Sequence, residues 1–354
     1  MKRKTYSQLQ LIGFIIAFFL SIFFCIKTYR LAQQFIEQTG ITPHVIYQLL
    51  FDRGVSLQAT DTRVNILILG IAGGTHEGPD LTDTMIVASV SKEKPALPST
   101  AGKPAGKPSV SLLSIPRDIW SETLKDRINS AYHYGEAKRT GGGKTLAKAV
   151  VEDVTGLVIH YVVVVDFSQF EQLIDVVGGI DVVVPKAFID TEYPIAGKEN
   201  DECGGDTTFA CRYETVQFAE GTTHMDGKTA LKYVRSRHAE GDEGTDFARG
   251  KRQQDVIVAL KEKIIQMKPW FHPNIAKQLI QVADLATDTD MTIGEQLTMG
   301  KFLLKVQSSA ISKIFIEPLL INPPSWMYGR YVLVPETDYE TIHTFIKKSL
   351  ENQP

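Results

Sequence analysis

The sequence predicts an α/β domain in which helices cover a central sheet, preceded by one membrane-spanning helix. Strand-like apolar runs alternate along the chain with segments of helical spacing, which is typical of an α/β sandwich. One apolar run near the N-terminus is long enough to span a membrane. The chain has 354 residues, of which 43% are hydrophobic and 22% charged. This length is sufficient for one large domain with a substantial core.

The N-terminal run extends from Leu9 to Ile26 and follows the basic Met1-Lys2-Arg3-Lys4. The basic cluster favours a cytoplasmic location for the N-terminus. The predicted segments are a cytoplasmic N-terminus at residues 1–8, a transmembrane anchor at residues 9–29 and a stalk at residues 30–62. A cleaved signal peptide is the alternative, but no clear small-residue cleavage site follows the run. We therefore expect a single-pass cell-membrane protein in which residues 63–354 form one extracytoplasmic domain.

The domain is expected to contain seven strands and six helices. Strands are predicted at Val64–Leu69, Met85–Val90, Val110–Ser114, Ile159–Val165, Ile180–Val184, Ser312–Ile316 and Tyr331–Val334. Helices are predicted at Lys144–Val154, Gln169–Val177, Asp246–Lys263, Asn274–Ala286, Ile293–Gln307 and Glu336–Leu350. Proline, glycine and lysine are frequent in residues 91–109, which predicts a disordered insert between two strands. Residues 186–217 are expected to form a long loop.

Arginines gather in the stretch from Phe218 to Leu260. If Tyr233–Arg237 forms a short strand, Arg235 and Arg237 project to the same side, because alternate residues of a strand share a face. A strand edge that carries two guanidinium groups is a candidate binding site for an anion.

The predicted helix Asp246–Lys263 adds further polar groups to this site. Asp246, Arg249 and Gln253 fall at spacings of three and four and line one helix face. Arg252 follows Arg249 and is counted with the candidate ligand-binding residues. Gathered like charges repel one another unless an anion lies between them, and arginine is suited to bidentate contact with phosphate. The alternative is that these arginines are solvated surface charges.

Two further charged residues stand at the ends of predicted strands. Asp83 begins the second strand and Arg117 follows the third, where α/β sheets tend to place ligand-binding groups. Asp83 could bind Mg²⁺, which prefers oxygen ligands, or it could cap a turn in Thr82-Asp83-Thr84. Arg117 could bind phosphate or serve as a structural ion-pair partner.

Several function classes are excluded. The run Gly141-Gly142-Gly143-Lys144-Thr145 lacks the first glycine of a phosphate-binding loop, because Lys138 occupies that position. The chain has no Gly-x-Ser-x-Gly, His-Glu-x-x-His or dinucleotide-binding glycine motif. The formal net charge of -3 argues against a general nucleic-acid binder.

Cys203 and Cys211 stand in a polar, glycine-containing segment. Such a pair can close a small disulfide loop outside the cytoplasm, remain as two free thiols, or form half of a metal site. No histidine lies nearby, so the metal site is the least supported of the three.

Seven segments between roughly residues 64 and 265 resemble, in order, those of the LytR-CpsA-Psr family. These proteins are membrane-anchored enzymes that move glycopolymers from a polyprenyl-diphosphate carrier to the cell wall. The segments are Asn65–Gly70, Leu81–Met85, Leu113–Asp118, Arg127–Tyr132, Asp175–Ile180, Met225–Arg237 and Asp246–Gln253. The resemblance implies a three-layer α/β/α sandwich with a central mixed sheet.

The resemblance also implies roles for the charged residues. Asp83 would hold Mg²⁺, whereas Arg117, Arg235, Arg237 and Arg249 would bind the diphosphate, and Gln253 would support it. Asp246 would position or activate the acceptor hydroxyl, and it joins Arg117, Arg235 and Arg237 as a candidate catalytic residue. An apolar groove lined by Val256, Ile257, Leu260 and Ile264 would take the polyprenyl tail, unless these four side chains simply pack between helix and sheet.

The chain departs from the family pattern at one position. Ala72 stands where many members carry a second Mg²⁺-binding aspartate. Asp80, Glu77 or His76 could substitute, or Asp83 and phosphate alone could hold the metal.

We therefore expect a phosphotransferase that moves a lipid-linked glycopolymer to a peptidoglycan hydroxyl. A non-catalytic binder of polyprenyl-phosphate lipids is the second hypothesis, because of Ala72. A membrane-linked transcriptional attenuator is the third, and the outward topology speaks against it.

Overall fold

The computed structural model describes residues 26–30, 33, 36, 55–73, 80–91, 108–268 and 273–351. The chain divides into two compact units, residues 1–56 with 292–298 and residues 57–291 with 299–354. In the first unit, residues 26–30 are helical, and the backbone N–H of Val55 donates a hydrogen bond to Thr298 Oγ1 at 3.1 Å. No helix within the described ranges combines the length and the apolar character needed to cross a membrane. Residues 1–8, nearly all of the predicted anchor and most of the predicted stalk lie outside the described residues.

A six-stranded mixed sheet forms the centre of the second unit, with the strand order β11-β6-β1-β2-β3-β12. Its strands are β1 (Arg63–Ile71), β2 (Thr82–Ser91), β3 (Ser109–Ser114), β6 (Tyr161–Asp166), β11 (Thr287–Thr289) and β12 (Ile311–Phe315). The pairs β1–β6 and β3–β12 are parallel, whereas β1–β2, β2–β3 and β6–β11 are antiparallel. The mixed sheet and its flanking helices confirm the predicted α/β class.

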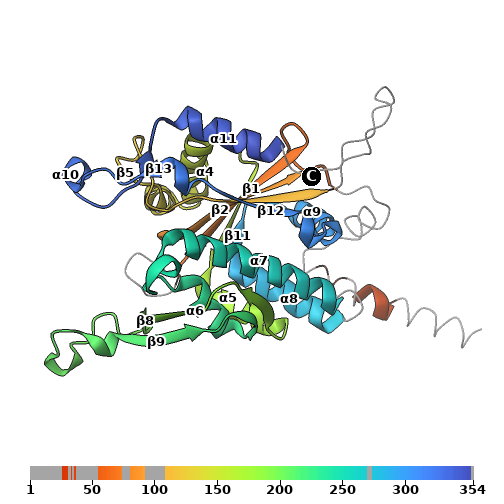
Figure 1. The fold of residues 1–354 in the computed structure, drawn as a ribbon. Coiled ribbons are helices and arrows are strands. Elements are labelled where there is room, and N and C mark those ends of the chain that lie inside the picture. The colour runs from red at the N-terminus through yellow and green to blue at the C-terminus, as the bar shows by residue number, and fades with distance from the viewer. Residues whose placement is uncertain are drawn as a thin grey trace, which may run out of the picture. The chain divides into compact units, whose positions relative to one another are not determined.

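Helices cover both faces of this sheet (Figure 1). The first face carries α3 (Ala131–Lys138), α4 (Gly142–Thr155) and α11 (Tyr339–Glu351), and the second carries α7 (Asp246–Met267) and the part of α9 (Ile293–Lys305) from Met299 onwards. Successive strand residues point to opposite faces. Accordingly, Leu67 and Leu69 pack in the core under α4 and α11, while Val64 and Ile66 pack in the core under α7.

A third core packs against α7, on the side away from the central sheet, and is built from the elements between residues 167 and 235. They are α5 (Phe167–Val176), β7 (Ile180–Val184), β8 (Phe188–Pro194), β9 (Tyr213–Phe218), β10 (Gly221–Met225) and α6 (Gly227–Arg235), with α8 (Pro273–Ala286) packed on α5. The rings of Phe188, Phe218 and Tyr233 contact one another in this core. β7 pairs with β10 rather than with the central sheet.

The strands not yet named form two further small sheets, and one further short α-helix is present. They are β4 (Trp120–Ser121) with β5 (Asp126–Arg127), β13 (Leu320–Ile321) with β14 (Val334–Pro335), and α10 (Ser325–Tyr328). The predicted strand Tyr331–Val334 is therefore wrong except at its last residue. β2 extends to Ser91 and β3 begins at Ser109. Ser91 and Ser109 therefore belong to strands and not to the predicted insert, of which residues 92–107 lie outside the described residues.

The predicted strand Tyr233–Arg237 is wrong, because residues 227–235 form helix α6. The helix begins after Asp226, whose carboxylate accepts a hydrogen bond from the backbone N–H of Thr229 at 2.8 Å. Its buried residues Ala230, Leu231 and Val234 follow helical spacing. This packing outweighs the preference of Tyr233 and Val234 for strands.

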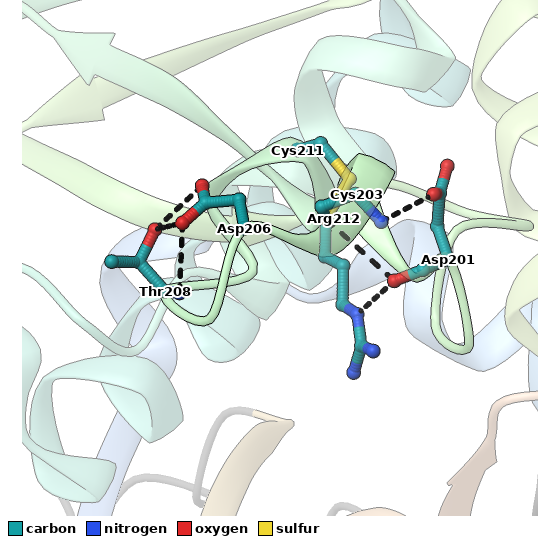
Figure 2. Close-up of a disulfide and its surroundings, with 6 residues drawn as sticks. All are labelled: Asp201, Cys203, Asp206, Thr208, Cys211 and Arg212. Atoms are coloured by element: carbon teal, nitrogen blue, oxygen red, sulfur yellow. Dashed lines mark hydrogen bonds between the residues drawn. A yellow bond between two sulfur atoms is a disulfide. The ribbon is translucent and has the colours of Figure 1, made fainter.

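The predicted loop 186–217 is also wrong in part, because β8 and β9 form an antiparallel hairpin within it. At the tip of the hairpin, Cys203 and Cys211 form a disulfide with a Cα–Cα distance of 5.6 Å (Figure 2). The carbonyl oxygen of Asp201 accepts a hydrogen bond from Arg212 Nε at 2.8 Å beside it. Of the three states that the sequence left open for these cysteines, the structure has the disulfide.

Candidate active site

A pocket of about 340 Å³ lies where β2, α6, α7 and the β8–β9 hairpin provide its walls. Its charged and polar lining consists of Asp83, Arg235, Arg237, His238, Arg249 and Gln253. Its other lining residues are Phe167, Pro194, Tyr213 and Val234. The structure thus brings five of the predicted site residues together at one place, beside an apolar surface.

The strand edge contributes Asp83 and Arg117. Arg117 Nη1 donates a hydrogen bond to Asp83 Oδ1, so Arg117 adjoins the pocket through Asp83. Asp118 is 4% exposed and faces two arginines, with Oδ2 3.5 Å from Arg117 Nε and Oδ1 2.8 Å from Arg127 Nη1. Burial lowers the pKa of Arg117, but the charges of Asp83, Asp118 and Asp246 outweigh it and raise that pKa overall.

The end of α6 contributes the next two arginines. Arg235 is the last residue of the helix and Arg237 follows its C-cap, Ser236. A helix C-terminus carries partial negative charge, which favours cations there. The predicted convergence of Arg235 and Arg237 is therefore observed, although it arises from a helix end and not from a strand face.

Helix α7 contributes Asp246, Arg249 and Gln253 from one face, as predicted. Thr245 caps the helix by accepting a hydrogen bond from the backbone N–H of Ala248 at 3.2 Å. Arg249 Nη2 lies 2.8 Å from Asp246 Oδ1. Asp246 does not line the pocket itself, but it adjoins the pocket through Arg249.

Burial and the charges of the site both act on Arg249. Its side chain is 8% exposed, and burial lowers its pKa; Asp246 raises that pKa, while the nearby Arg117 and Arg237 lower it further. The net direction is downward. A bound anion would raise the pKa of Arg249 again, because its negative charge would offset the repulsion among the three guanidinium groups. This local excess of positive charge is suited to a ligand with several negative charges.

The prediction that Arg252 contacts the ligand is wrong, because its guanidinium group is turned into the protein. It is 2% exposed and donates hydrogen bonds to the backbone oxygens of Tyr233, Ser236 and Glu243 at 3.0, 2.6 and 2.9 Å. It also pairs with the Glu243 carboxylate at 3.2 Å and stacks 4.7 Å from the Phe188 ring centre. Arg252 therefore holds the segment between α6 and α7, and does not reach a ligand in the pocket.

Asp190 is a positioning residue that the sequence did not indicate. It is 1% exposed, and its Oδ2 accepts hydrogen bonds from Ser236 Oγ at 2.6 Å, Arg237 N at 3.0 Å and His238 N at 3.2 Å. It thus fixes the backbone that presents Arg237. The alternation that places Asp190 on the same strand face as buried Phe188 is a signal that could have identified it.

We expect Asp190→Asn to destabilise the protein at neutral pH. Burial raises the pKa of Asp190, but hydrogen bonds from Ser236 and from the backbone N–H groups of His238, Glu192 and Arg237 outweigh it and lower the pKa. The carboxylate therefore stabilises the fold above the unfolded pKa of about 3.9, and this stabilisation is lost as the pH falls through the folded pKa. Urea midpoints of wild type and variant should differ at pH 7, and the difference should shrink as the pH falls from about 4 through the lower folded pKa. Exposed Asp242→Asn serves as the control, and a difference that does not change with pH would contradict the assignment.

The apolar lining comes from residues that the sequence did not single out. Phe167 fits against Gly70, where a Cβ would lie 2.6 Å from the ring. Pro194 and Tyr213 are paired at the base of the disulfide loop. By contrast, Val256 is buried in the third core, Leu260 and Ile264 pack against it, and Ile257 packs in the core under α7. The predicted tail groove on α7 is therefore wrong, and helix packing explains those four residues.

Removing the disulfide should loosen this wall of the pocket. We expect Cys203→Ser/Cys211→Ser to lower the free energy of unfolding by about 2–3 kcal/mol, from the loop-closure entropy of so short a ring. Because Pro194 and Tyr213 lie where the loop meets β8 and β9, we also expect weaker binding of a ligand with several negative charges. Chemical denaturation and calorimetric titration measure the two effects. Equal stability of variant and wild type would contradict this role.

The described residues offer a divalent cation few protein ligands. Asp83 lines the pocket, but Ala72 has no ligand atom, and both oxygens of Asp80 lie 2.9 Å from His133 Nδ1. Glu77 and His76 lie outside the described residues. The one grouping of three potential metal ligands within the described ranges, Asp201 with Cys203 and Cys211, contains the disulfide and offers no thiolate. Mg²⁺ commonly binds through one carboxylate and substrate phosphates, so Asp83 fits that arrangement.

A sequence model of the LytR_cpsA_psr family matches residues 38–348 of the chain. The chain is 29% identical over 256 residues to the polyisoprenyl-teichoic acid–peptidoglycan teichoic acid transferase TagV of Bacillus subtilis, covering 70% of this chain and 57% of TagV. It is 32% identical over 201 residues to the transferase TagU of Oceanobacillus iheyensis, covering 55% of this chain and 50% of that protein. The chain thus spans about half the length of these relatives.

Solved structures share the fold. The crystal structure of B. subtilis TagV has a TM-score of 0.54 at 24% identity, covering 84% of this chain and 100% of that chain. The structure of TagT bound to LI-WTA has a TM-score of 0.54 at 21% identity, covering 84% of this chain and 95% of that chain.

Proposed function

Because the chain belongs to the LytR_cpsA_psr family, we propose that it transfers a glycopolymer from a polyprenyl-diphosphate carrier to a hydroxyl group of peptidoglycan. The observation that carries this proposal is the pocket in which Arg235, Arg237 and Arg249 meet beside an apolar lining. A diphosphate and the prenyl chain attached to it require these two surfaces side by side. Two relatives are named as transferases of teichoic acid, so teichoic acid is the first polymer to test.

The guanidinium groups supply the electrostatics of the reaction. Transfer of a phosphoryl group to a hydroxyl develops charge on the non-bridging oxygens, and enzymes assist it mainly by positioning and by stabilising that charge. Arg235 and Arg237 would bind the diphosphate from the α6 end, and Arg249 and Gln253 from α7. Asp246 orients Arg249, and Asp190 with Arg252 holds the backbone of Arg237 in place.

Asp83 would hold Mg²⁺ together with phosphate oxygens of the donor. The ion would supply positive charge to those oxygens. Asp83 and Arg117 form an ion pair, which keeps both groups at the pocket edge. The absence of a carboxylate at Ala72 predicts that the metal binds only weakly before the donor does.

Mg²⁺ should therefore strengthen donor binding through Asp83. We expect EDTA to weaken binding of a short-chain prenyl diphosphate to wild type severalfold, and to leave binding to Asp83→Asn unchanged. Calorimetric titration with and without Mg²⁺ measures both. Equal Mg²⁺ dependence in the two proteins would contradict the assignment of Asp83 as the ligand.

The domain is proposed to act outside the cytoplasm, anchored through residues 9–29. The Cys203–Cys211 disulfide supports this location, because disulfides persist mainly in oxidising compartments. Labelling of an introduced cysteine near residue 240 in intact cells, compared with lysed cells, tests the orientation.

The decisive experiment is a transfer assay with purified full-length protein in detergent, a synthetic lipid-diphosphate-linked teichoic acid precursor, peptidoglycan fragments and Mg²⁺. We expect a phosphodiester-linked product and released polyprenyl phosphate, both detectable by mass spectrometry. Tight donor binding without cleavage of the diphosphate would overturn the proposal in favour of a non-catalytic lipid binder.

A further inference from the structure

Glu317 lies at the edge of the sheet that carries Arg117. β12 pairs in parallel with β3, and Phe315 stands opposite Ser114. The chain continues from these neighbouring strand ends to Glu317 and to Arg117 respectively. Because the carboxyl ends of adjacent parallel strands meet at one edge, the two side chains leave the sheet from the same region.

The first turn of α7 packs over this edge and places Asp246 there. The ring of Phe247, next to Asp246, lies 4.8 Å from the ring of Phe315 in an edge-on contact. One turn on, Gly250 allows close approach, since a Cβ there would lie 2.7 Å from Ser114 Oγ. The Phe247–Phe315 contact and the close approach of Gly250 to Ser114 therefore hold the first turns of α7, with Asp246, over the strand ends that lead to Glu317 and Arg117.

The Glu317 carboxyl group is an unusual one. Its Oε2 atom is buried and has no hydrogen-bond partner among residues that the structure describes. Burial raises the pKa of Glu317, its own backbone N–H lowers that pKa, and the charge of Asp246 raises it again. The backbone N–H of Ile316 lowers it, and the net pKa is about 7. A buried acceptor atom without a partner is costly, which favours a site that gains a hydrogen bond when a ligand arrives.

Asp246 is already engaged, because its Oδ1 lies 2.8 Å from Arg249 Nη2 in an ion pair, and Arg249 lines the donor pocket. Tyr331 is 51% exposed, and burial together with Asp246 and Asp118 raises its pKa. The Asp246 side chain is 34% exposed, so it reaches solvent as well as the donor pocket, which it meets at Arg249. An acceptor that enters past Asp246 would meet the diphosphate at Arg249.

We propose that Glu317 is the general base that removes the proton from the acceptor hydroxyl group, while Asp246 holds Arg249 in position. This inference rests on the proposed transferase function and deepens it. It assigns proton removal to a residue outside the Asp246–Gln253 segment, and it gives the unpartnered Oε2 atom a role as proton acceptor.

In the proposed step, the acceptor oxygen forms a bond to the phosphorus of the sugar-linked phosphate, and the acceptor proton passes to Glu317 Oε2. The bond from that phosphorus to the bridging oxygen breaks, and its electron pair leaves with the polyprenyl phosphate. Glu317 then releases the proton to solvent. A base whose pKa lies near the working pH is the most effective one for such a transfer.

The test compares wild type, Glu317→Gln, Glu317→Asp and the exposed control Glu340→Gln in the transfer assay from pH 5 to 9. We expect Glu317→Gln to lower kcat by ~10²–10⁴-fold, the range for loss of a general base. Donor affinity should stay within about twofold, because Glu317 does not line the donor pocket. The acid limb of the wild-type kcat profile should disappear in Glu317→Gln, Glu317→Asp should restore part of the rate, and Glu340→Gln should match wild type.

Three results would overturn the proposal. They are a Glu317→Gln protein with the wild-type rate, an unchanged acid limb in that variant, and a loss of rate matched by an equal loss of donor affinity. In each case the wild type still transfers polymer, so the proposed function stands. If the wild type binds donor and makes no product, both the proposed function and this assignment fail.

Discussion

Arg235→Ala/Arg237→Ala should abolish most of the transfer activity and leave the fold intact. A hydrogen bond to a charged group is worth about 1.5–3 kcal/mol, so the loss of two such contacts predicts a ~10²–10⁴-fold drop in donor affinity or rate. Arg237 is exposed and Arg235 is half-buried, and neither belongs to a hydrophobic core. Calorimetric titration with a prenyl diphosphate and the transfer assay measure the two quantities.

The matched control is Lys186→Ala/Lys228→Ala, which removes the same total charge from exposed positions outside the pocket lining. We expect the control to bind donor with wild-type affinity at physiological salt. Full activity of the double arginine variant would refute the pocket as the donor site. Equal losses in both variants would mean that overall charge, and not the pocket, attracts the diphosphate.

Arg252→Ala should have the largest effect on stability. The substitution leaves three backbone oxygens and the Glu243 carboxylate without their donor in a buried place. Breaking a buried charge pair from one side costs about 3–5 kcal/mol, which lowers Tm on the order of 10 °C for a domain of this size. Scanning calorimetry and circular dichroism measure the shift.

Arg252→Lys separates packing from charge, because lysine keeps the charge but not the planar group that reaches three acceptors. We expect an intermediate loss of stability and weaker donor binding, since the Arg237 backbone is no longer held. Exposed Lys251→Ala should leave both unchanged. A folded Arg252→Ala protein with wild-type Tm but no donor binding would instead support direct contact between Arg252 and the diphosphate.

The sequence determined the composition of the site more reliably than the local geometry that builds it. Helical spacing correctly placed Asp246, Arg249 and Gln253 on one face of α7, because that face is set by sequence separation alone. Arg252 was also predicted as a ligand-binding residue, but it lies on the neighbouring helix face and is buried. Spacing identifies which residues share a face, but it does not say whether that face meets a pocket or a core.

Long-range contacts decided the remaining features. Tyr233–Arg237 became the end of a helix because Asp226 caps it and its apolar residues pack in the third core. Asp190 became a positioning residue because a hairpin, hidden in a polar segment, brings it to residues 236–238. The packing of α6 in the third core and the hydrogen bonds of Asp190 both depend on partners tens of residues away, which the local sequence pattern does not specify.

The sequence by itself determined the α/β class, the alternation of strands and helices, and the charged residues that a diphosphate site requires. These follow from local periodicity and side-chain chemistry. The tertiary structure alone decided that the arginines share one pocket with Phe167, Pro194 and Tyr213, that the cysteines are joined, and that β12, which leads to Glu317, pairs with β3. The physical reason is that burial and electrostatic environment depend on packing between segments distant in the chain, and residue spacing does not encode that packing.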